Sequence, residues 1–236
     1  MNKKVIILTS KDKIINFTLI NNLKKNSNIK ILSVISLKEN NTIKKKIKLI
    51  FLLNIQNIVE ILYKLLIGLF SNKNLIKNSV FYRDINSKIT IDYINSLKSE
   101  LVICINCPQI LTNNTIKLIK APLYNFHPGD IPSYRGVFIP FFLLKNKTNK
   151  ACLTFHKISV EIDSGEVINK KYYDIENSDN IYSIYKKIFI SVEAISFITE
   201  CIEHSNKLNF QINPEDENRY YTYPNLKEIL MFRLGL

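Results

Sequence analysis

Cysteine and arginine are both scarce in this 236-residue chain. Four cysteines in a chain of this length can form few cross-links, which excludes a small protein held together by disulfides. The net charge of +13 comes almost entirely from lysine, because only four of the 33 basic residues are arginines. Nucleic-acid grooves and phosphate clamps draw on the planar arginine side chain, so we expect no nucleic-acid partner. The positive field favours anionic small molecules.

Long uncharged hydrophobic runs are also absent. The most apolar stretch, residues 47–70, contains Lys48, Glu60, Lys64 and three side-chain amides, whereas a membrane-spanning helix needs roughly 20 nearly uncharged residues. Lysines before it would suit an anionic membrane surface, but its helical period favours a helix packed on the core. At the N-terminus, the apolar run at residues 5–9 is too short for a secretion signal. We therefore expect a cytoplasmic protein without stable membrane insertion.

Internal repeats and linkers rich in proline, glycine or serine are missing, which predicts one continuous domain over residues 1–205. Expected strands cover residues 5–9, 29–36, 80–83, 101–105, 123–126, 151–156 and 166–173. Expected helices cover residues 14–23, 43–70, 91–97, 114–119 and 181–202. This alternation predicts an α/β fold, a mostly parallel twisted sheet flanked by helices. Residues 206–236 are expected to add a hairpin (208–212, turn 213–218, 220–223) and a terminal helix.

Polar side chains gather where the strand at 123–126 ends, and ligands of such sheets bind outside the carboxyl ends of the strands. Asn125 and His127 are two residues apart, so their side chains point to the same side of a strand. An amide can donate to a developing oxyanion, and an imidazole can accept a proton near neutral pH. Asp163, in a loop between two expected strands, can fix the tautomer of that histidine and stabilise its cation.

These residues belong to a longer pattern. Asn-x-His-x-x-x-x-Pro-x-Tyr-Arg-Gly begins at Asn125, and Thr-x-His-x-x-x-x-x-x-Asp-x-Gly begins at Thr154. Together they resemble the signature of the folate-dependent formyltransferases over residues 80–173. One departure lies in the loop, where many relatives have Ser-Leu and this chain has Gly129-Asp130.

The resemblance implies a Rossmann-like formyltransferase fold and an enzyme that uses 10-formyltetrahydrofolate without a metal. Asn125 would then stabilise the oxyanion, His127 would act as acid and base, and Asp163 would orient His127. The resemblance also implies a pterin held between two loops, whose matching residues here are Pro108, Gln109, Ile110 and Leu111 on one side and Val160, Glu161 and Ile162 on the other.

The flanking sequence separates three kinds of relative by the amine they formylate. Glycinamide ribonucleotide enzymes carry a glycine-rich loop after the first strand, and residues 9–13 contain no glycine. Methionyl-tRNA enzymes carry an extra C-terminal domain, but only about 100 residues follow Gly136. Residues 220–224, with Glu228 and Phe232, resemble the tail of bacterial sugar N-formyltransferases. We therefore expect a nucleotide-linked amino dideoxysugar as acceptor, of the dTDP-4-amino-4,6-dideoxyglucose type, for O-antigen and other surface polysaccharide.

Candidate contacts to this anionic acceptor are Ser10, Lys11, Lys77, Tyr134, Arg135 and Gly136. Arg135 is the strongest of them, and a loop-anchoring or buried structural arginine is the alternative. The tyrosines at residues 220–223 would stack on a nucleobase or form the buried face of a hairpin or a homodimer contact, and we favour the latter.

Other signals point to other functions. Cys104 and Cys107 match Cys201 and His204 in spacing, as in a zinc site, but Cys104 lies in an apolar strand, so we expect buried thiols. A thioredoxin-like role is disfavoured because nothing near the pair in sequence lowers a thiol pKa. His156 is expected to support the site, not to catalyse. A non-enzymatic basic binding module ranks lower, because the lysines are scattered.

Overall fold

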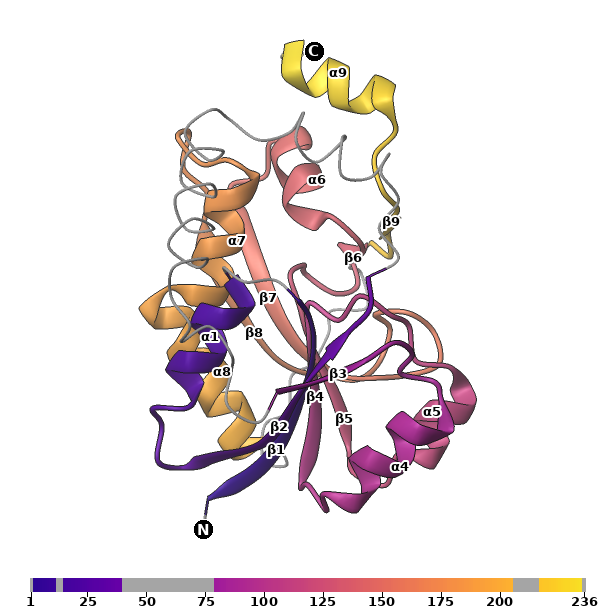
Figure 1. The fold of residues 1–236 in the computed structure, drawn as a ribbon. Coiled ribbons are helices and arrows are strands. Elements are labelled where there is room, and N and C mark those ends of the chain that lie inside the picture. Colours follow the sequence, from indigo (N-terminus) through magenta and orange to yellow (C-terminus); the bar gives the residue numbers. More distant parts are fainter. Residues whose placement is uncertain (1, 12–14, 40–78, 206–216, 235–236) are drawn as a thin grey trace, which may run out of the picture.

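The computed structural model describes residues 2–11, 15–39, 79–205 and 217–234. Its centre is a seven-stranded sheet with the order β3-β2-β1-β4-β5-β7-β8 (Figure 1). Five strands pair in parallel, and the last two, β7 and β8, are antiparallel. The expected mostly parallel sheet is thus confirmed. The strand bounds are β1 (Lys3–Ser10), β2 (Ile29–Leu37), β3 (Ser79–Tyr82), β4 (Leu101–Ile105), β5 (Leu123–His127), β7 (Lys150–Lys157) and β8 (Val167–Asp174).

Helices cover both faces of the sheet, as the nearly continuous apolar strands require. Along β4, Leu101, Ile103 and Ile105 face the cluster that includes α1 (Ile15–Leu23), α7 (Ile181–Ile190) and α8 (Val192–His204). Val102 and Cys104 face the opposite cluster, with α4 (Lys88–Ser96) and α5 (Asn113–Leu118). The two helix layers flank the sheet in Figure 1. Side-chain N-caps begin α4, α5, α7 and α8.

The segment expected as one helix over residues 181–202 is two helices, and this expectation was wrong. The chain leaves helical geometry at Ser191, which has a ψ of 161°. The Ser191 hydroxyl then accepts a hydrogen bond from the backbone N–H of Ala194 and begins α8. Serine competes for backbone groups in this way, so it favours a new helix start over continuation.

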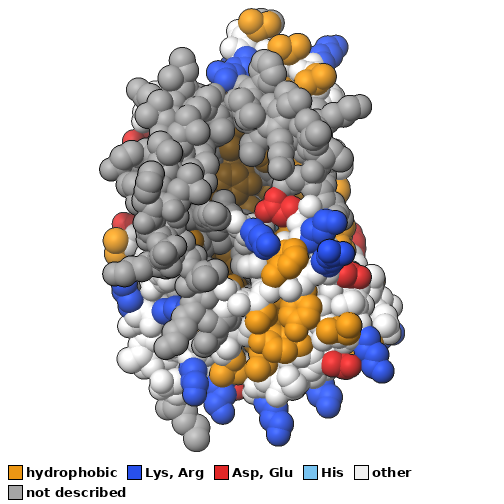
Figure 2. Space-filling model, in the orientation of Figure 1, with side chains coloured by type: hydrophobic (Ala, Val, Ile, Leu, Met, Phe, Trp, Pro, Cys, Tyr) orange, Lys and Arg blue, Asp and Glu red, His pale blue; other side chains and the backbone are white. Residues whose placement is uncertain are grey.

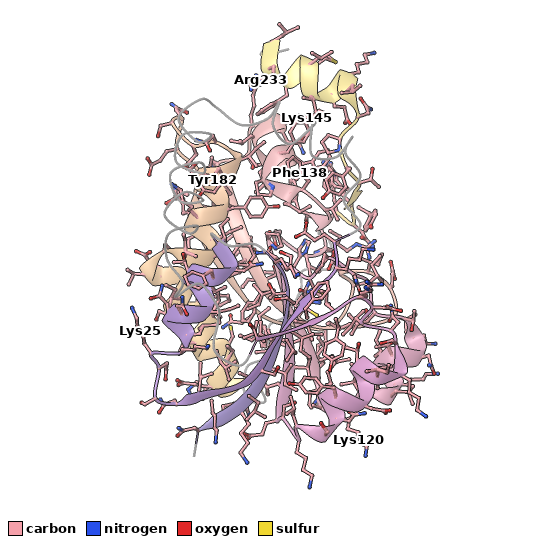
Figure 3. All side chains as sticks on the ribbon, viewed as in Figure 1. Lys25, Lys120, Phe138, Lys145, Tyr182 and Arg233 are labelled. Atoms are coloured by element: carbon pink, nitrogen blue, oxygen red, sulfur yellow. The ribbon has the colours of Figure 1, made fainter. Side chains whose placement is uncertain are left out.

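The C-terminal residues pack against a loop and a helix that the sequence did not predict. β9 (Tyr220–Tyr221) pairs in parallel with β6 (Arg135–Gly136). The expected terminal helix is confirmed as α9 (Leu226–Leu234), and Ile229 is buried with Phe141 and Phe142 of α6 (Ile139–Lys145). Lys145, labelled in Figure 3, forms an ion pair with Glu228 of α9 at 2.7 Å.

Some expectations lie outside the described residues, namely the helix at 43–70, Lys77 and the first hairpin strand at 208–212. Within the part of the chain that is described, no helix is long and apolar enough to cross a membrane.

Candidate active site

A cavity of about 560 Å³ opens at the carboxyl ends of β1, β4 and β5. The strand order reverses between β1 and β4, which is where sheets of this kind form a ligand crevice. Ser10 after β1 and Asn106 after β4 line the cavity, opposite Asn125 and His127 of β5. The space-filling view shows a hollow on this face, with hydrophobic side chains in its depth and basic side chains beside it (Figure 2).

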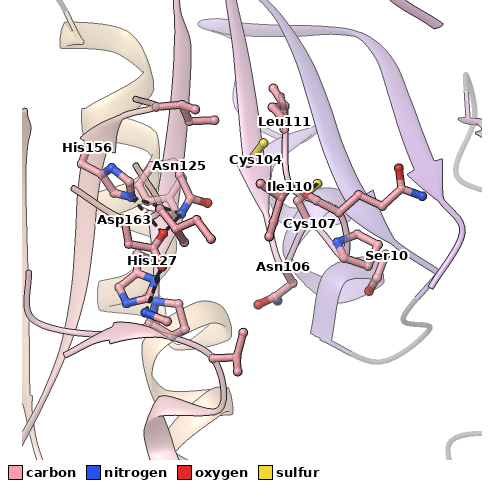
Figure 4. Close-up of a pocket in the computed structure, with 18 of the residues that line it drawn as sticks. Ser10, Cys104, Asn106, Cys107, Ile110, Leu111, Asn125, His127, His156 and Asp163 are labelled. Atoms are coloured by element: carbon pink, nitrogen blue, oxygen red, sulfur yellow. Dashed lines mark hydrogen bonds and ion pairs between the residues drawn. The ribbon is translucent and has the colours of Figure 1, made fainter. Parts of the chain in front are cut away.

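Asp163 joins the catalytic candidates from the loop between β7 and β8. Its Oδ2 accepts the Gly136 N–H at 3.0 Å and lies 3.5 Å from His127 Nδ1. Its Oδ1 accepts from Asn125 Nδ2 at 3.4 Å. The backbone of Asp163 is left-handed, with a φ of +50°, a region that aspartate tolerates better than most residues. The three candidates therefore meet at one carboxylate on the cavity wall (Figure 4).

His127 is almost fully buried and faces an oxygen at each ring nitrogen. Nε2 donates to the carbonyl oxygen of Tyr134 at 2.7 Å, because a carbonyl can only accept. Nδ1 faces the Asp163 carboxylate at 3.5 Å. Both ring nitrogens are therefore placed opposite oxygen atoms of the protein.

His156 supports Asn125 as a neutral ring. Nδ1 donates to its neighbour's carbonyl, Lys157 O, at 2.8 Å, which leaves Nε2 to accept from Asn125 Nδ2 at 3.1 Å. Burial, and then the positive charge of His127, lower the pKa of His156 to about 4, although Asp163 opposes this shift. His156 is thus uncharged near neutral pH and holds the Asn125 amide by its nitrogen.

The amide nitrogen of Asn125 is held by groups of the protein, and its expected role at the oxyanion stays a prediction. Both of its hydrogens point to acceptors within the protein, His156 Nε2 and Asp163 Oδ1. The oxygen of Asn125 points across the cavity toward Asn106 (Figure 4). In this arrangement Asn125 presents a hydrogen-bond acceptor to a ligand, whereas an oxyanion requires a donor.

Arg135 anchors the loop that carries Asp163. Its guanidinium donates to the Glu161 carboxylate at 2.7 Å and to the carbonyl of Ile162 at 3.4 Å. Neither Arg135 nor Glu161 lines the cavity, and the Glu161 side chain is 71% exposed. The loop-anchoring interpretation of Arg135 is the one that its contacts favour.

Asp130, which departs from the resembling pattern, fixes the loop after β5. Its carboxylate accepts from Lys170 Nζ at 2.6 Å and from the Tyr172 hydroxyl at 3.1 Å. Its carbonyl accepts the Tyr134 N–H at 2.6 Å. Since the carbonyl of Tyr134 holds His127, the Asp130 contacts help to position the histidine.

The two loops expected to hold a pterin face each other across the cavity. Pro108, Gln109, Ile110 and Leu111 line one side, and Val160 and Ile162 line the other. The Gln109 side chain is bound within the protein. It donates to the carbonyls of Lys38 and Arg83 and accepts the N–H of Ile85. Backbone and apolar groups of this loop therefore remain to contact a ligand.

The acceptor candidates divide into two groups. Ser10 and Gly136 line the cavity, while Lys11 and Tyr134 do not. Lys11 lies over the Phe81 ring at 3.6 Å, and Tyr134 stacks on Tyr221 at 5.2 Å. The lining residues that sequence reasoning missed include Glu39, Asn106, Phe138 and Tyr185. Asn106 directly follows β4, so the rule that ligands bind at the carboxyl ends of strands could have found it.

The spacing that suggested a zinc site does not bring its four residues together. Cys104 packs in the cluster on one face of the sheet, and Cys201 packs in the cluster on the other. Among the described residues, no group of three or more histidine, cysteine, aspartate or glutamate side chains could hold a metal ion.

Residues 3–197 match the sequence profile of a family described as formyl transferase. The bifunctional polymyxin resistance protein ArnA of Wigglesworthia glossinidia brevipalpis is 29% identical over 146 residues, which are 61% of this chain and 22% of that protein. The methionyl-tRNA formyltransferase of Thermotoga maritima is 23% identical over 145 residues, 61% of this chain and 45% of that protein. The chain thus spans less than half the length of either relative.

Solved structures share the fold. A sugar N-formyltransferase from Shewanella sp FDAARGOS_354 has a TM-score of 0.60 at 17% identity, covering 93% of this chain and 76% of that one. A Helicobacter canadensis N-formyltransferase, in complex with folinic acid and dTDP-3-aminofucose, has a TM-score of 0.60 at 20% identity, covering 94% and 71%. A phosphoribosylglycinamide formyltransferase from Anaplasma phagocytophilum has a TM-score of 0.61 at 18% identity, covering 93% and 98%.

Proposed function

Since the chain belongs to the formyl transferase family, we propose that it transfers a formyl group from 10-formyltetrahydrofolate to the amine of a nucleotide-linked amino sugar. The observation that carries this proposal is the convergence of Asn125, His127 and Asp163 on one wall of the cavity. Acyl transfer needs stabilisation of an oxyanion and a route for one proton, and this group can supply both.

The reaction begins when the amine nitrogen attacks the formyl carbon and the carbonyl oxygen becomes negative. The His127 cation, held by Asp163 and the Tyr134 carbonyl, stabilises that charge. The tetrahedral intermediate then collapses, and the bond between the formyl carbon and the folate nitrogen breaks. His127 gives a proton to the leaving folate nitrogen, and the neutral ring then takes up the proton lost by the amine. For both transfers Nε2 exchanges its contact with the Tyr134 carbonyl for one with the reactants.

Asn125 contributes through both ends of its amide. As placed, its oxygen can accept a hydrogen bond from the attacking amine and orient the nitrogen lone pair toward the formyl carbon. Donation to the oxyanion, the role expected from sequence, requires the amide nitrogen to exchange its long 3.4 Å contact with Asp163. Such contacts in a ligand-free site are often rearranged when a substrate binds.

The folate is proposed to lie between residues 108–111 and residues 158–162. Ile110 and Val160, at opposite sides of the cavity, are 64% and 62% exposed, so both are available to an apolar ring. With the Gln109 side chain bound to the protein, backbone groups of this loop would contact the polar edge of the pterin.

A nucleotide-linked sugar is the acceptor that the cavity supports best. Tyr220 and Tyr223 line it while 47% and 42% exposed, and Tyr223 stacks on Phe138 at 5.8 Å. Exposed aromatic rings at a cavity are suited to stack on a nucleobase. The net charge of +13 favours a pyrophosphate. We propose dTDP-4-amino-4,6-dideoxyglucose as the first acceptor to test, and a cytoplasmic reaction that supplies surface polysaccharide.

Mass spectrometry of reaction mixtures tests the function directly. The protein is given 10-formyltetrahydrofolate with nucleotide-linked amino sugars, glycinamide ribonucleotide or methionyl-tRNA as separate acceptors. We expect one formyl group on an amino sugar, none with His127→Asn, and full transfer with His204→Gln, a variant at an exposed histidine. Transfer only to glycinamide ribonucleotide or methionyl-tRNA would overturn the proposed acceptor. Transfer to none, with no folate binding in a titration, would overturn the proposed reaction.

A further inference from the structure

Two cysteines that the proposed reaction does not use lie in the wall of the same cavity. Cys104 is the fourth residue of β4, and Cys107 follows after a turn in which Asn106 has a φ of +49°. Both line the cavity, next to Ile110 and Leu111 (Figure 4). Cys104 is buried, while Cys107 is partly exposed, so a small molecule in the cavity can reach Cys107 first.

The two thiols are close enough in the cavity wall for each to change the pKa of the other. The Cys107 thiol itself donates to the carbonyl of Gln109 at 3.4 Å. The interaction between the two cysteine side chains lowers the pKa of Cys107, and a backbone contact with Gln109 adds to this effect. The same interaction, followed by burial, raises the pKa of Cys104 well above its usual value. The sequence-based expectation that nothing near the pair lowers a thiol pKa was wrong, because the neighbour that does so is the other cysteine. The thiolate, which is the reactive form, therefore develops on the more accessible sulfur.

The remaining cysteines provide a contrast within the same chain. Burial raises the pKa of Cys152 to about 12, and burial also raises the pKa of Cys201. Both side chains are buried, and neither lines this cavity. Thiols in such surroundings are inert.

We propose that Cys104 and Cys107 form a peroxide-sensitive dithiol site in the cavity wall, and that its oxidation to a disulfide distorts the proposed folate site. The Cys107 thiolate attacks hydrogen peroxide, forms a sulfenic acid and releases hydroxide. The hydroxide formed in that step takes the proton of the Cys104 thiol and becomes water. The Cys104 thiolate then attacks the sulfenic sulfur, forms the S–S bond and releases hydroxide, which the proton lost by Cys107 converts to the second water. In total two thiols lose two electrons and two protons, and one peroxide is reduced to two waters.

The consequence for binding follows from the short connection between the two sulfurs. A bond between them constrains the turn at residues 104–107 and pulls on Cys107, which begins the wall made by residues 108–111. That wall cannot shift freely, because the Gln109 side chain ties it to the carbonyls of Lys38 and Arg83 and to the Ile85 N–H. Oxidation therefore distorts the loop at residues 104–111, because the hydrogen bonds of Gln109 hold one part of it in place while the disulfide pulls on another. This inhibitory step rests on the proposed function, whereas the dithiol chemistry does not.

Thiol counting on the folded protein tests the site. After treatment with hydrogen peroxide, we expect two of the four thiols to disappear and peptide mass spectrometry to show a Cys104–Cys107 disulfide that dithiothreitol reverses. Cys152 and Cys201 should stay reduced, and Cys107→Ser should keep all three of its thiols. Retention of four thiols, a sulfinic acid on Cys107 beside a free Cys104, or equal loss at Cys152 and Cys201 would each overturn the proposal. The unmodified chain gives the answer even if the variant does not fold.

Formyl transfer by the same samples tests the consequence. We expect oxidation to lower turnover by about 100-fold, the size of effect that a misplaced binding group can cause. Dithiothreitol should restore it, and Cys107→Ser should not respond to peroxide. Equal turnover of the reduced and disulfide forms would overturn the inhibitory step. Absence of transfer by the reduced protein would instead count against the proposed function, and the thiol count would still decide the dithiol site.

Discussion

At the scale of single residues, the site depends on which atoms of Asn125 and His127 are turned to the protein and which to the cavity. Asp163 binds one nitrogen of each, and His156 accepts the second amide hydrogen of Asn125. That role requires a neutral His156, because a protonated ring has no acceptor. The buried His156 therefore orients the amide of Asn125. Its Nε2 is occupied by this hydrogen bond and is not available to a ligand.

The low pKa of His156 predicts a pH-dependent loss of stability. An unfolded histidine has a pKa near 6.5 and the folded one about 4, so the unfolded state binds more protons between these values. The unfolding free energy should fall by up to about 3 kcal/mol as the pH drops through this window. Urea titrations from pH 7 to pH 4 measure it.

The His156→Gln variant isolates this contribution, because glutamine can accept from Asn125 and donate to Lys157 O without titrating. We expect it to lose less stability on acidification than the natural chain, and His204→Gln to behave like the natural chain. An identical pH dependence in the His156→Gln variant would contradict the assignment.

At the scale of elements, the loop after β5 is held by an ion pair between its Asp130 and Lys170 of the edge strand β8. The Lys170 side chain is 2% exposed, and its partner Asp130 is 30% exposed. A buried charge whose counter-charge is removed destabilises a protein more than a charge that water can reach. The two ends of this ion pair are therefore not equivalent.

This asymmetry predicts the order of two substitutions. Asp130→Asn removes the negative charge bound to a buried ammonium and should lower the unfolding free energy by roughly 2–3 kcal/mol, whereas Lys170→Met leaves a hydrated carboxylate and should cost about 1 kcal/mol. Chemical denaturation of both variants and of the double variant measures the order and the coupling. Lys170→Met as the more damaging change would refute this account of the loop.

The aromatic residues that line the cavity from the β6–α6 loop and the tail make a separate prediction. Tyr223 stacks on Phe138, and stacking of a base on such a ring is worth about 1–3 kcal/mol. Tyr223→Ala should raise the KM for the nucleotide sugar by about tenfold or more and leave the KM for the folate unchanged. Steady-state kinetics with each substrate varied separate the two. Equal changes in both constants would mean that Tyr223 shapes the cavity and does not contact the base.

At the scale of the whole molecule, the C-terminal residues pack against the domain that residues up to 205 form. The β9 backbone accepts the Val137 N–H at 3.0 Å, and Ile229 of α9 is 2% exposed against Phe141 and Phe142. Far from the site, the exposed Lys25 and Lys120 point outward (Figure 3), as expected of scattered lysines that keep a protein soluble. The homodimer expected from the tail stays a prediction.

Truncation tests how far the tail contributes. A chain that ends at Ser205 should lose both thermal stability and activity, because β6 loses its strand partner and two phenylalanines lose their cover. A chain that ends at Leu234 is the matched control and should retain both. Calorimetry and formyl transfer measure the two effects. Normal melting of the shorter chain would show that residues 206–236 are a separate unit, as the sequence suggested.

The sequence by itself determined the α/β class, most strand positions and the residues that meet at Asp163. It could do so because the parallel strands are continuous apolar runs, and because Asn125, His127 and Asp163 lie in motifs of fixed local spacing. The break at Ser191 was also encoded locally, but hydrophobic periodicity on both sides concealed it.

Only the tertiary structure decided how the side chains are used. The direction of the Asn125 amide depends on His156, which is brought opposite by antiparallel pairing of β5 with β7. The pairing of β9 with β6 joins residues far apart in the chain. The interaction between Cys104 and Cys107 depends on a left-handed turn at Asn106. Hydrogen-bond direction and thiol reactivity are set by neighbours within a few ångströms, and those neighbours come largely from distant segments that spacing along the chain does not specify.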